Sequence, residues 1–247
     1  MKILSIGNSF SQNAQEYLYN LAKHNGVKLK TVNLFIGGCP LRTHYLNMLN
    51  DAKAYAFMFN GKDTNIKVTM SEALSSDDWD IVTLQQASPH SGNYSTYTPY
   101  IEELAEYVRT YCPKAKILIH ETWAYEDSCD RFGALSKYTS SRDMYENIHA
   151  AYEKAAEAIE ADGIIPAGAA MLAASELGVK VHYTDGKHAG LGCGKYLLAL
   201  CWYKYLTGKD IDNDSFDEFE TPVTEEERAL IIKAVNSAVK TTLTLEL

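Results

Sequence analysis

Residues 2–11, KILSIGNSFS, decide the fold that this sequence predicts. Residues 2–6 form a short apolar run with β-branched isoleucines, which is typical of a strand, and Gly7 ends the run. The sequence then predicts a helix over residues 11–24, with Ser11 as its N-cap and a glycine shortly after its end. A strand that passes through a short turn into a helix is the first half of a β-α-β unit.

The same alternation continues along the chain. Further apolar runs predict strands over four ranges: 27–35, 80–84, 115–119 and 163–166. Helical periodicity is present over four more: 100–112, 141–162, 189–207 and 225–240. Strands that alternate with helices of this length predict parallel β-α-β units. We therefore expect an α/β fold with a mostly parallel five-stranded sheet and helices on both of its faces.

Residues 54–70 depart from this rhythm. They predict two short strands around Asn60-Gly61, which we interpret as a small β-hairpin inserted at the sheet edge. The chain has 247 residues, of which 46% are hydrophobic and 22% are charged, and it contains no repeat or linker. Because this composition is ordinary for a globular protein, we expect a single domain over residues 1–247 that carries the hairpin.

The charge and the cysteine content limit which classes of binding partner and which cellular compartment the sequence predicts. The 23 basic and 32 acidic residues give a net charge of −9, so we predict neither a nucleic-acid nor a membrane partner. No apolar window is long enough to span a bilayer or to form a signal peptide, although a chain whose leader had been cleaved would look the same. The five widely spaced cysteines form no Cys-x-x-Cys pair, which fits a reducing cytoplasm.

Ser9 is the first candidate for chemistry. It follows the first predicted strand, and in an open parallel sheet the loops after the strands share the rim where ligands bind. Backbone N–H groups at such a turn can stabilise developing negative charge. Ser9 is therefore a candidate nucleophile, although glycine, asparagine and serine also make ordinary turns. The same serine-rich loop could instead cradle a phosphate, as in a flavodoxin-like FMN site.

A loop far downstream supplies the partners that a nucleophilic serine needs. Asp185 can bind the ring Nδ1 of His188, three residues later, which leaves Nε2 free to accept a proton from a hydroxyl. His182, Asp185 and His188 would suit a metal if they lay on a helix, but the segment reads as a loop, so we predict no metal and no cofactor. A conventional α/β-hydrolase elbow does not fit, because Ser9 follows the first strand and the elbow's second glycine is missing.

These residues and their order resemble the SGNH superfamily, also called the GDSL lipase/esterase superfamily, and look closest to a poorly characterised bacterial branch of it. Gly7-Asn8-Ser9 matches the first block with Asn in place of Asp, Gly38 matches the second, and Asp185 with His188 matches the last. The resemblance covers most of the chain, up to about residue 207. It implies a three-layer α/β/α, flavodoxin-like sandwich and a catalytic triad of Ser9, Asp185 and His188.

The resemblance also implies an oxyanion hole. Its donors would be the backbone N–H groups of Ser9 and Gly38 and an amide side chain from the third block. Where the superfamily has Gly-x-Asn-Asp, this chain has Gln85-Gln86, and only one of two successive strand side chains should face the site. We predict Gln86 for this role, with Gln85 as the alternative. In a plainer interpretation both side chains only form hydrogen bonds at the end of a loop.

Together these features predict a serine esterase that hydrolyses a short-acyl ester, such as an acetyl ester, on a small molecule or a glycan. Trp123 and Tyr125, after the fourth strand, would form a substrate wall or else cap the core. The alternative function is a catalytically degenerate glycan-binding protein or a phosphate- or FMN-binding module. The sequence predicts no particular oligomeric state.

Overall fold

The computed structural model describes residues 1–130, 137–179 and 183–243. Within these residues seven strands form one sheet in the order β4-β3-β2-β1-β5-β6-β7. Five of them are parallel: β1 (Lys2–Gly7), β2 (Lys30–Phe35), β5 (Ile81–Leu84), β6 (Lys116–His120) and β7 (Gly163–Ile165). The mostly parallel α/β fold is as predicted.

The predicted number of strands is wrong, because the sheet has seven and not five. The two additional strands are β3 (Tyr55–Phe59) and β4 (Lys62–Val68), which form an antiparallel hairpin. Val32 of β2 is paired with Phe59 of β3, so the hairpin continues the sheet instead of lying apart from it. Its backbone groups thereby complete the hydrogen bonds of an otherwise open edge.

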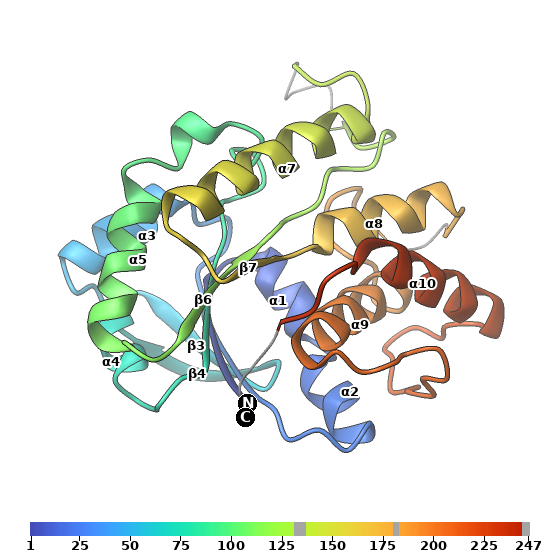
Figure 1. Cartoon of the computed structure of the whole chain (residues 1–247), viewed down its shortest axis with the longest axis horizontal. Helices are drawn as coiled ribbons and strands as arrows, with labels where there is room; N and C mark the ends of the chain where they lie inside the picture. Colours follow the sequence, from blue (N-terminus) through green and yellow to red (C-terminus); the bar gives the residue numbers. More distant parts are fainter. Residues whose placement is uncertain (131–136, 180–182, 244–247) are drawn as a thin grey trace.

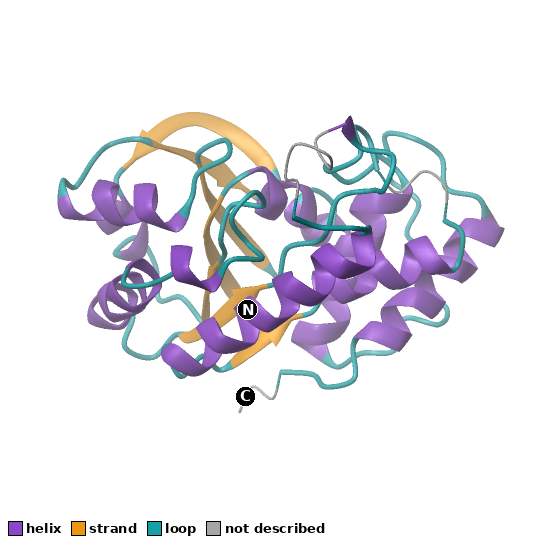
Figure 2. Ribbon diagram, turned by 90° about the horizontal axis from the view of Figure 1, so that it is seen from above, coloured by secondary structure: helices purple, strands orange, loops and turns teal. Residues whose placement is uncertain are grey.

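Helices cover both faces of the sheet (Figures 1 and 2). On one side lie α3 (Leu41–Leu49), α4 (Met70–Leu74) and α5 (Tyr100–Tyr111), with α7 (Ser141–Ala158) joined to α5 by a hydrogen bond from Arg109 to the Ile159 carbonyl. On the other side lie α1 (Ser9–Gln15), α2 (Leu18–His24) and α9 (Cys193–Thr207). Two further helices pack on α9: α8 (Ala167–Glu176) and α10 (Glu225–Ala238). The result is the predicted three-layer sandwich.

The first helix begins earlier than the sequence predicts. Its N-cap is Asn8 and not Ser11, because the Asn8 side chain accepts a hydrogen bond from the backbone of Phe10. Ser11 completes a capping box by accepting from the Asn8 backbone N–H. The expected single helix over 11–24 is also two helices, which are separated by a turn at Glu16 and Tyr17. The cap moves Ser9 into the first turn of α1.

Helix α9 is buried on nearly every side, which matches the apolar sequence over 189–207. A helix that is apolar all round belongs in a protein core or a membrane. Here it packs against α1, α2, α8 and α10. None of the helices in the described residues is both long and apolar enough to cross a bilayer. All five cysteines are buried and unpaired.

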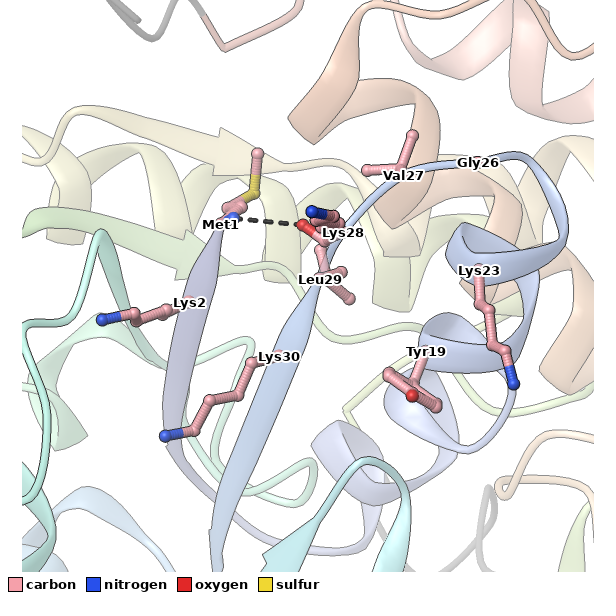
Figure 3. A pocket seen from close by; sticks show the side chains of 9 residues that line it. All are labelled: Met1, Lys2, Tyr19, Lys23, Gly26, Val27, Lys28, Leu29 and Lys30. Carbon is pink, nitrogen blue, oxygen red and sulfur yellow. Dashed lines mark hydrogen bonds between the residues drawn. The ribbon is translucent and has the colours of Figure 1, made fainter.

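A cavity of about 510 Å³ lies at the amino ends of the strands, on the rim opposite Ser9. Figure 3 shows Lys2 and Lys30 pointing to one side of it and Lys23 to the other. Lys2 and Lys30 both bind Asp77, at 2.6 and 2.5 Å. Because these two ammonium groups are already neutralised by a carboxylate of the protein and Lys23 points away from them, the three lysines do not form an anion-binding site.

Glu121 is a fully buried carboxylate just after β6. One oxygen accepts a hydrogen bond from the Ala169 N–H near the start of α8, and the other is 2.7 Å from Nδ1 of His149 on α7. The backbone beside it is packed so closely that a Cβ on Gly168 would lie 2.5 Å from a carbonyl oxygen. Glu121 therefore holds α7 and α8 against the end of β6.

This contact makes the stability of the protein depend on pH. The hydrogen bond to Glu121 raises the pKa of His149 above its usual value of 6.5. Its stabilisation is fully present below pH 6.5 and is lost as the pH rises through the higher folded-state pKa. We expect the free energy of unfolding, measured with urea between pH 6 and 9, to fall with pH more steeply in the wild type than in His149→Gln.

His24→Gln is the matched control, because among the described residues His24 forms a hydrogen bond with the Ser215 hydroxyl and no ion pair with a carboxylate. Its pH dependence should follow that of the wild type. Equal slopes in the wild type and His149→Gln would show that the Glu121 contact does not change the titration of His149.

Candidate active site

The structure brings Ser9 next to two side chains from a distant part of the sequence. Ser9 begins α1, whereas Asp185 and His188 lie in the loop before α9, and His188 is 179 residues from Ser9. The Nε2 of His188 is 2.9 Å from the Ser9 hydroxyl, and its Nδ1 is 2.9 Å from the Asp185 carboxylate. Ser9 and His188 are both partly exposed, so a ligand could reach the hydroxyl.

The loop that carries His188 is fixed to two elements. The backbone N–H of Ala189 donates to Asn13, one helical turn after Ser9, at 3.0 Å. The indole of Trp123, after β6, donates to the Lys187 carbonyl at 2.7 Å. These bonds fix the backbone on both sides of His188 and thereby position its imidazole. Asn13 was not among the residues predicted from the sequence, although its i+4 spacing from Ser9 places both on one helix face.

Gly186 lets this loop pack closely on the segment before it. Its φ is +76°, and an added Cβ would lie 2.6 Å from the Cβ of Cys129. The Gly186 carbonyl accepts a hydrogen bond from Glu126 at 2.7 Å. A side chain at position 186 would meet both a backbone penalty and a collision, so the loop geometry depends on this glycine.

Asp185 is held in its charged form. Burial alone would raise the pKa of Asp185, but hydrogen bonds from the His188 backbone, the His188 ring and the Lys187 backbone outweigh it and lower the pKa to about 2. The carboxylate is therefore ionised at neutral pH. An ionised acid at Nδ1 favours the tautomer that carries its proton there, which leaves Nε2 free to accept the proton of Ser9.

Two backbone donors near Ser9 are unused. Among the described residues, neither the Ser9 N–H nor the Gly38 N–H donates a hydrogen bond to another protein group. Gly38 is exposed and has a φ of +63°, a conformation that glycine adopts readily. The following carbonyl, that of Cys39, accepts from the Asn8 side chain at 3.2 Å, which ties the Gly38 loop to the residue before Ser9.

Gln86 does not supply the free donor predicted for it. Its Nε2 donates to the carbonyl and the hydroxyl of Thr96, at 3.0 and 3.2 Å. Its Oε1 accepts from the Leu41 and Ala87 backbone N–H groups. The amide is thus used to join the loop after β5 to the start of α3. Of the two glutamines it is Gln85 that contacts the Ser9 turn, through a 2.8 Å bond to Asn8 Oδ1.

Gln85 belongs to a buried chain of hydrogen bonds with a defined direction. The Cys39 carbonyl can only accept, so Asn8 presents Nδ2 to it and Oδ1 to Gln85. Gln85 therefore presents Oε1 to His120, whose Nδ1 is 2.8 Å away and must carry a proton. Burial lowers the pKa of His120 to about 3, so its ring is neutral. The chain joins the ends of β1, β5 and β6 to the Gly38 loop.

Trp123 and Tyr125 do not form an open substrate wall. Their side chains are 0% and 1% exposed. Trp123 packs on Phe10 with ring centroids 4.3 Å apart and holds the Lys187 carbonyl, while the Tyr125 hydroxyl lies 2.9 Å from that of Ser88. The alternative in which they cap the core fits these contacts. Aromatic residues after a strand do not by themselves distinguish the two roles.

No metal cluster accompanies these side chains. Among the described residues, no three His, Cys, Asp or Glu side chains are placed to hold a metal ion. His182, considered with Asp185 and His188 as a ligand set, lies outside the described residues.

Comparison with known proteins shows which family and fold the chain shares. A family model described as "Domain of unknown function (DUF4886)" matches residues 2–237. A crystal structure of a DUF4886 family protein from Bacteroides uniformis is 33% identical, with a TM-score of 0.90, and the match covers 100% of this chain and 99% of that one. No curated protein matches the sequence.

More distant structures share the fold. A protein provisionally described as an SGNH hydrolase from Slackia heliotrinireducens is 24% identical over 83% of this chain and 97% of its own, with a TM-score of 0.60. The acetylxylan esterase Axe2 from Geobacillus stearothermophilus is 14% identical over 82% and 92%, with a TM-score of 0.51. The fold is therefore that of the SGNH hydrolases.

The buried chain of hydrogen bonds can be tested without any assumption about function. Gln85→Met keeps the volume but leaves the buried Nδ1–H of His120 unpaired, which typically costs about 1–3 kcal/mol. We expect urea unfolding to show a loss of this size. The double variant Gln85→Met/His120→Phe, which removes both partners, should recover part of it. A single variant as stable as the wild type would show that the chain contributes little.

Proposed function

The chain belongs to the DUF4886 family, and we propose that it is a serine esterase that cleaves short-acyl esters through an acyl-serine intermediate. The observation that carries this proposal is the chain of two 2.9 Å contacts that links Ser9 to His188 and His188 to Asp185. A nucleophile, a base and an orienting acid in this order are what acyl transfer to serine requires. The SGNH hydrolase fold of the chain supports the same class of reaction.

In the first half of the reaction Ser9 Oγ attacks the ester carbonyl carbon while His188 Nε2 takes the hydroxyl proton. Asp185 remains ionised and stabilises the imidazolium that forms. The tetrahedral intermediate then breaks the bond to the alcohol oxygen, and His188 returns the proton to that oxygen. The products of this half are the free alcohol and an acyl group on Ser9.

Water completes the cycle by the same proton path. His188 accepts a proton from the water as its oxygen attacks the acyl carbon, and returns it to Ser9 Oγ as the carboxylic acid leaves. In each half the negative oxygen of the intermediate accepts hydrogen bonds from the backbone N–H groups of Ser9 and Gly38, which have no other protein acceptor among the described residues. A donor of this kind contributes about 3–4 kcal/mol to transition-state binding.

The substrate class follows from the site and from its relatives. Ser9 is only partly exposed, and the Phe10 ring lies 5.9 Å from the ring of His188, so we expect a small acyl group such as acetyl to suit the space near Ser9 better than a long chain. Axe2, which shares the fold, is an acetylxylan esterase. An acetyl ester on a sugar is therefore the substrate that we propose. A phosphate- or FMN-binding function would leave the paired Asp185 and His188 without a role.

Removing the nucleophile tests the proposal most directly. Ser9→Ala should reduce kcat for p-nitrophenyl acetate by at least about 10³-fold, because acyl transfer then lacks its acceptor. The wild type should also be labelled at Ser9 by a fluorophosphonate probe, as mapped by peptide mass spectrometry.

Ser215→Ala, which changes an exposed serine, is the control and should keep wild-type turnover. The melting temperature of Ser9→Ala should stay close to that of the wild type. Undiminished turnover in a folded Ser9→Ala protein would refute the mechanism.

Asp185→Asn isolates the role of the acid. The amide should favour the wrong tautomer of His188 and lower kcat by about 10⁴-fold with little change in folding. Since the pKa of Asp185 is about 2, the carboxylate stays ionised from neutral pH down to about pH 3. The wild-type pH–rate profile between pH 5 and 9 should therefore contain no ionisation of Asp185. A variant with near-wild-type kcat would exclude Asp185 from the mechanism.

A further inference from the structure

A polar cavity of about 390 Å³ opens on the same rim of the sheet as Ser9. One wall is the start of α3, with Pro40 and Arg42, and the other is the loop after β5, with Gln86, His90 and Thr96. Tyr100, at the start of α5, also lines it. Its volume is in the range of cavities that bind small molecules.

Both walls are joined to the residue before Ser9. The Cys39 carbonyl, next to Pro40, accepts from Asn8 Nδ2, and Gln85, next to Gln86, donates to Asn8 Oδ1. In the sheet, β2 and β5 are the two neighbours of β1, so the loops that follow them flank the turn that carries Ser9. The cavity thus adjoins the Ser9 turn and the Gly38 loop. The His188 loop is held elsewhere, by α1 and the segment after β6.

The walls of the cavity have a distinct chemistry. They carry a guanidinium, an imidazole, an amide and several hydroxyl groups, but no carboxylate. The Arg42 side chain is exposed, and within the described residues its guanidinium forms no ion pair or hydrogen bond. The positive charge of Arg42 is therefore not neutralised by any carboxylate among the residues that line the cavity. Such a group attracts an anion.

We propose that this cavity binds the alcohol part of the ester, and that this part is an acidic sugar, a polyhydroxylated ring that carries a carboxylate. The guanidinium of Arg42 matches a carboxylate with two parallel hydrogen bonds. The hydroxyl-bearing walls suit the hydroxyl groups of the ring, and Tyr100 offers an aromatic face for its C–H surface. The inference rests on the proposed esterase function, because it assigns the leaving alcohol of that reaction.

Kinetics with two matched esters test the proposal. The substrates are acetylated methyl galacturonate with a free carboxylate and the equally acetylated methyl galactoside. We expect a wild-type kcat/KM about 10- to 100-fold higher for the acidic ester, mainly through KM, and a preference that falls as salt is added. Arg42→Gln should bring the ratio close to one. Lys114→Gln, which removes a cation at the opposite rim, should keep the wild-type ratio.

A binding experiment separates this inference from the esterase mechanism. Calorimetry on Ser9→Ala should detect the binding of methyl galacturonate, and methyl galactoside should bind at least tenfold more weakly. The double variant Ser9→Ala/Arg42→Gln should show no binding of methyl galacturonate. If p-nitrophenyl acetate is not cleaved by the wild type, the esterase proposal fails while this binding arm still reports on the cavity. Equal binding of the two sugars, or equally tight binding of inorganic phosphate or sulfate, would overturn the acidic-sugar assignment.

Discussion

The amide side chain of Asn8 makes three hydrogen bonds that join neighbouring strand ends. It accepts from the Phe10 backbone, which starts α1, and from Gln85, which follows β5, and it donates to the Cys39 carbonyl in the loop after β2. Asn8 is 1% exposed, so none of these bonds competes with bulk water. Because an unpaired buried amide is costly, the three elements are held in one arrangement. That arrangement sets where Ser9 leaves the sheet.

The site is therefore assembled from two parts, each with its own set of hydrogen bonds, that both use helix α1. One part is the Asn8 network, which places Ser9, the Gly38 N–H and the walls of the polar cavity. The other is the His188 loop, which is anchored by Asn13 and Trp123. The two parts meet on α1, where Ser9 contacts His188 and Asn13 accepts a hydrogen bond from Ala189. Such rigid support on both sides is what a proton transfer over 2.9 Å needs, since small displacements of the reacting atoms are costly to rate.

Several features follow from the sequence because they depend on neighbouring residues. Apolar runs of four to six residues followed by helical periodicity identify parallel β-α-β units. A strand whose two faces are both buried is apolar at nearly every position, so each strand can be identified from its own residues. Ser9 and Gly38 follow parallel strands, whose loops gather on one rim, so their placement on that rim could be predicted. The order of Ser9, Gly38, Asp185 and His188 added the prediction of a triad through the resemblance to the SGNH superfamily.

The remaining features depend on residues that are distant in sequence and adjacent in space. One such feature is the choice between Asn8 and Ser11 as the cap of α1, and another is the choice between Gln85 and Gln86 at the Ser9 turn. Both choices depend on which hydrogen-bond partners the loops after β2 and β5 place nearby. The spacing of side chains along one strand does not contain that information. The hairpin belongs to the sheet because β3 pairs with the edge of β2. Trp123 is buried because the Phe10 ring packs against its indole. The sequence alone determined the class of the sheet and the residues that we propose to react. Tertiary structure decided hydrogen-bond partners and burial, since each is a property of pairs of segments and not of either segment alone.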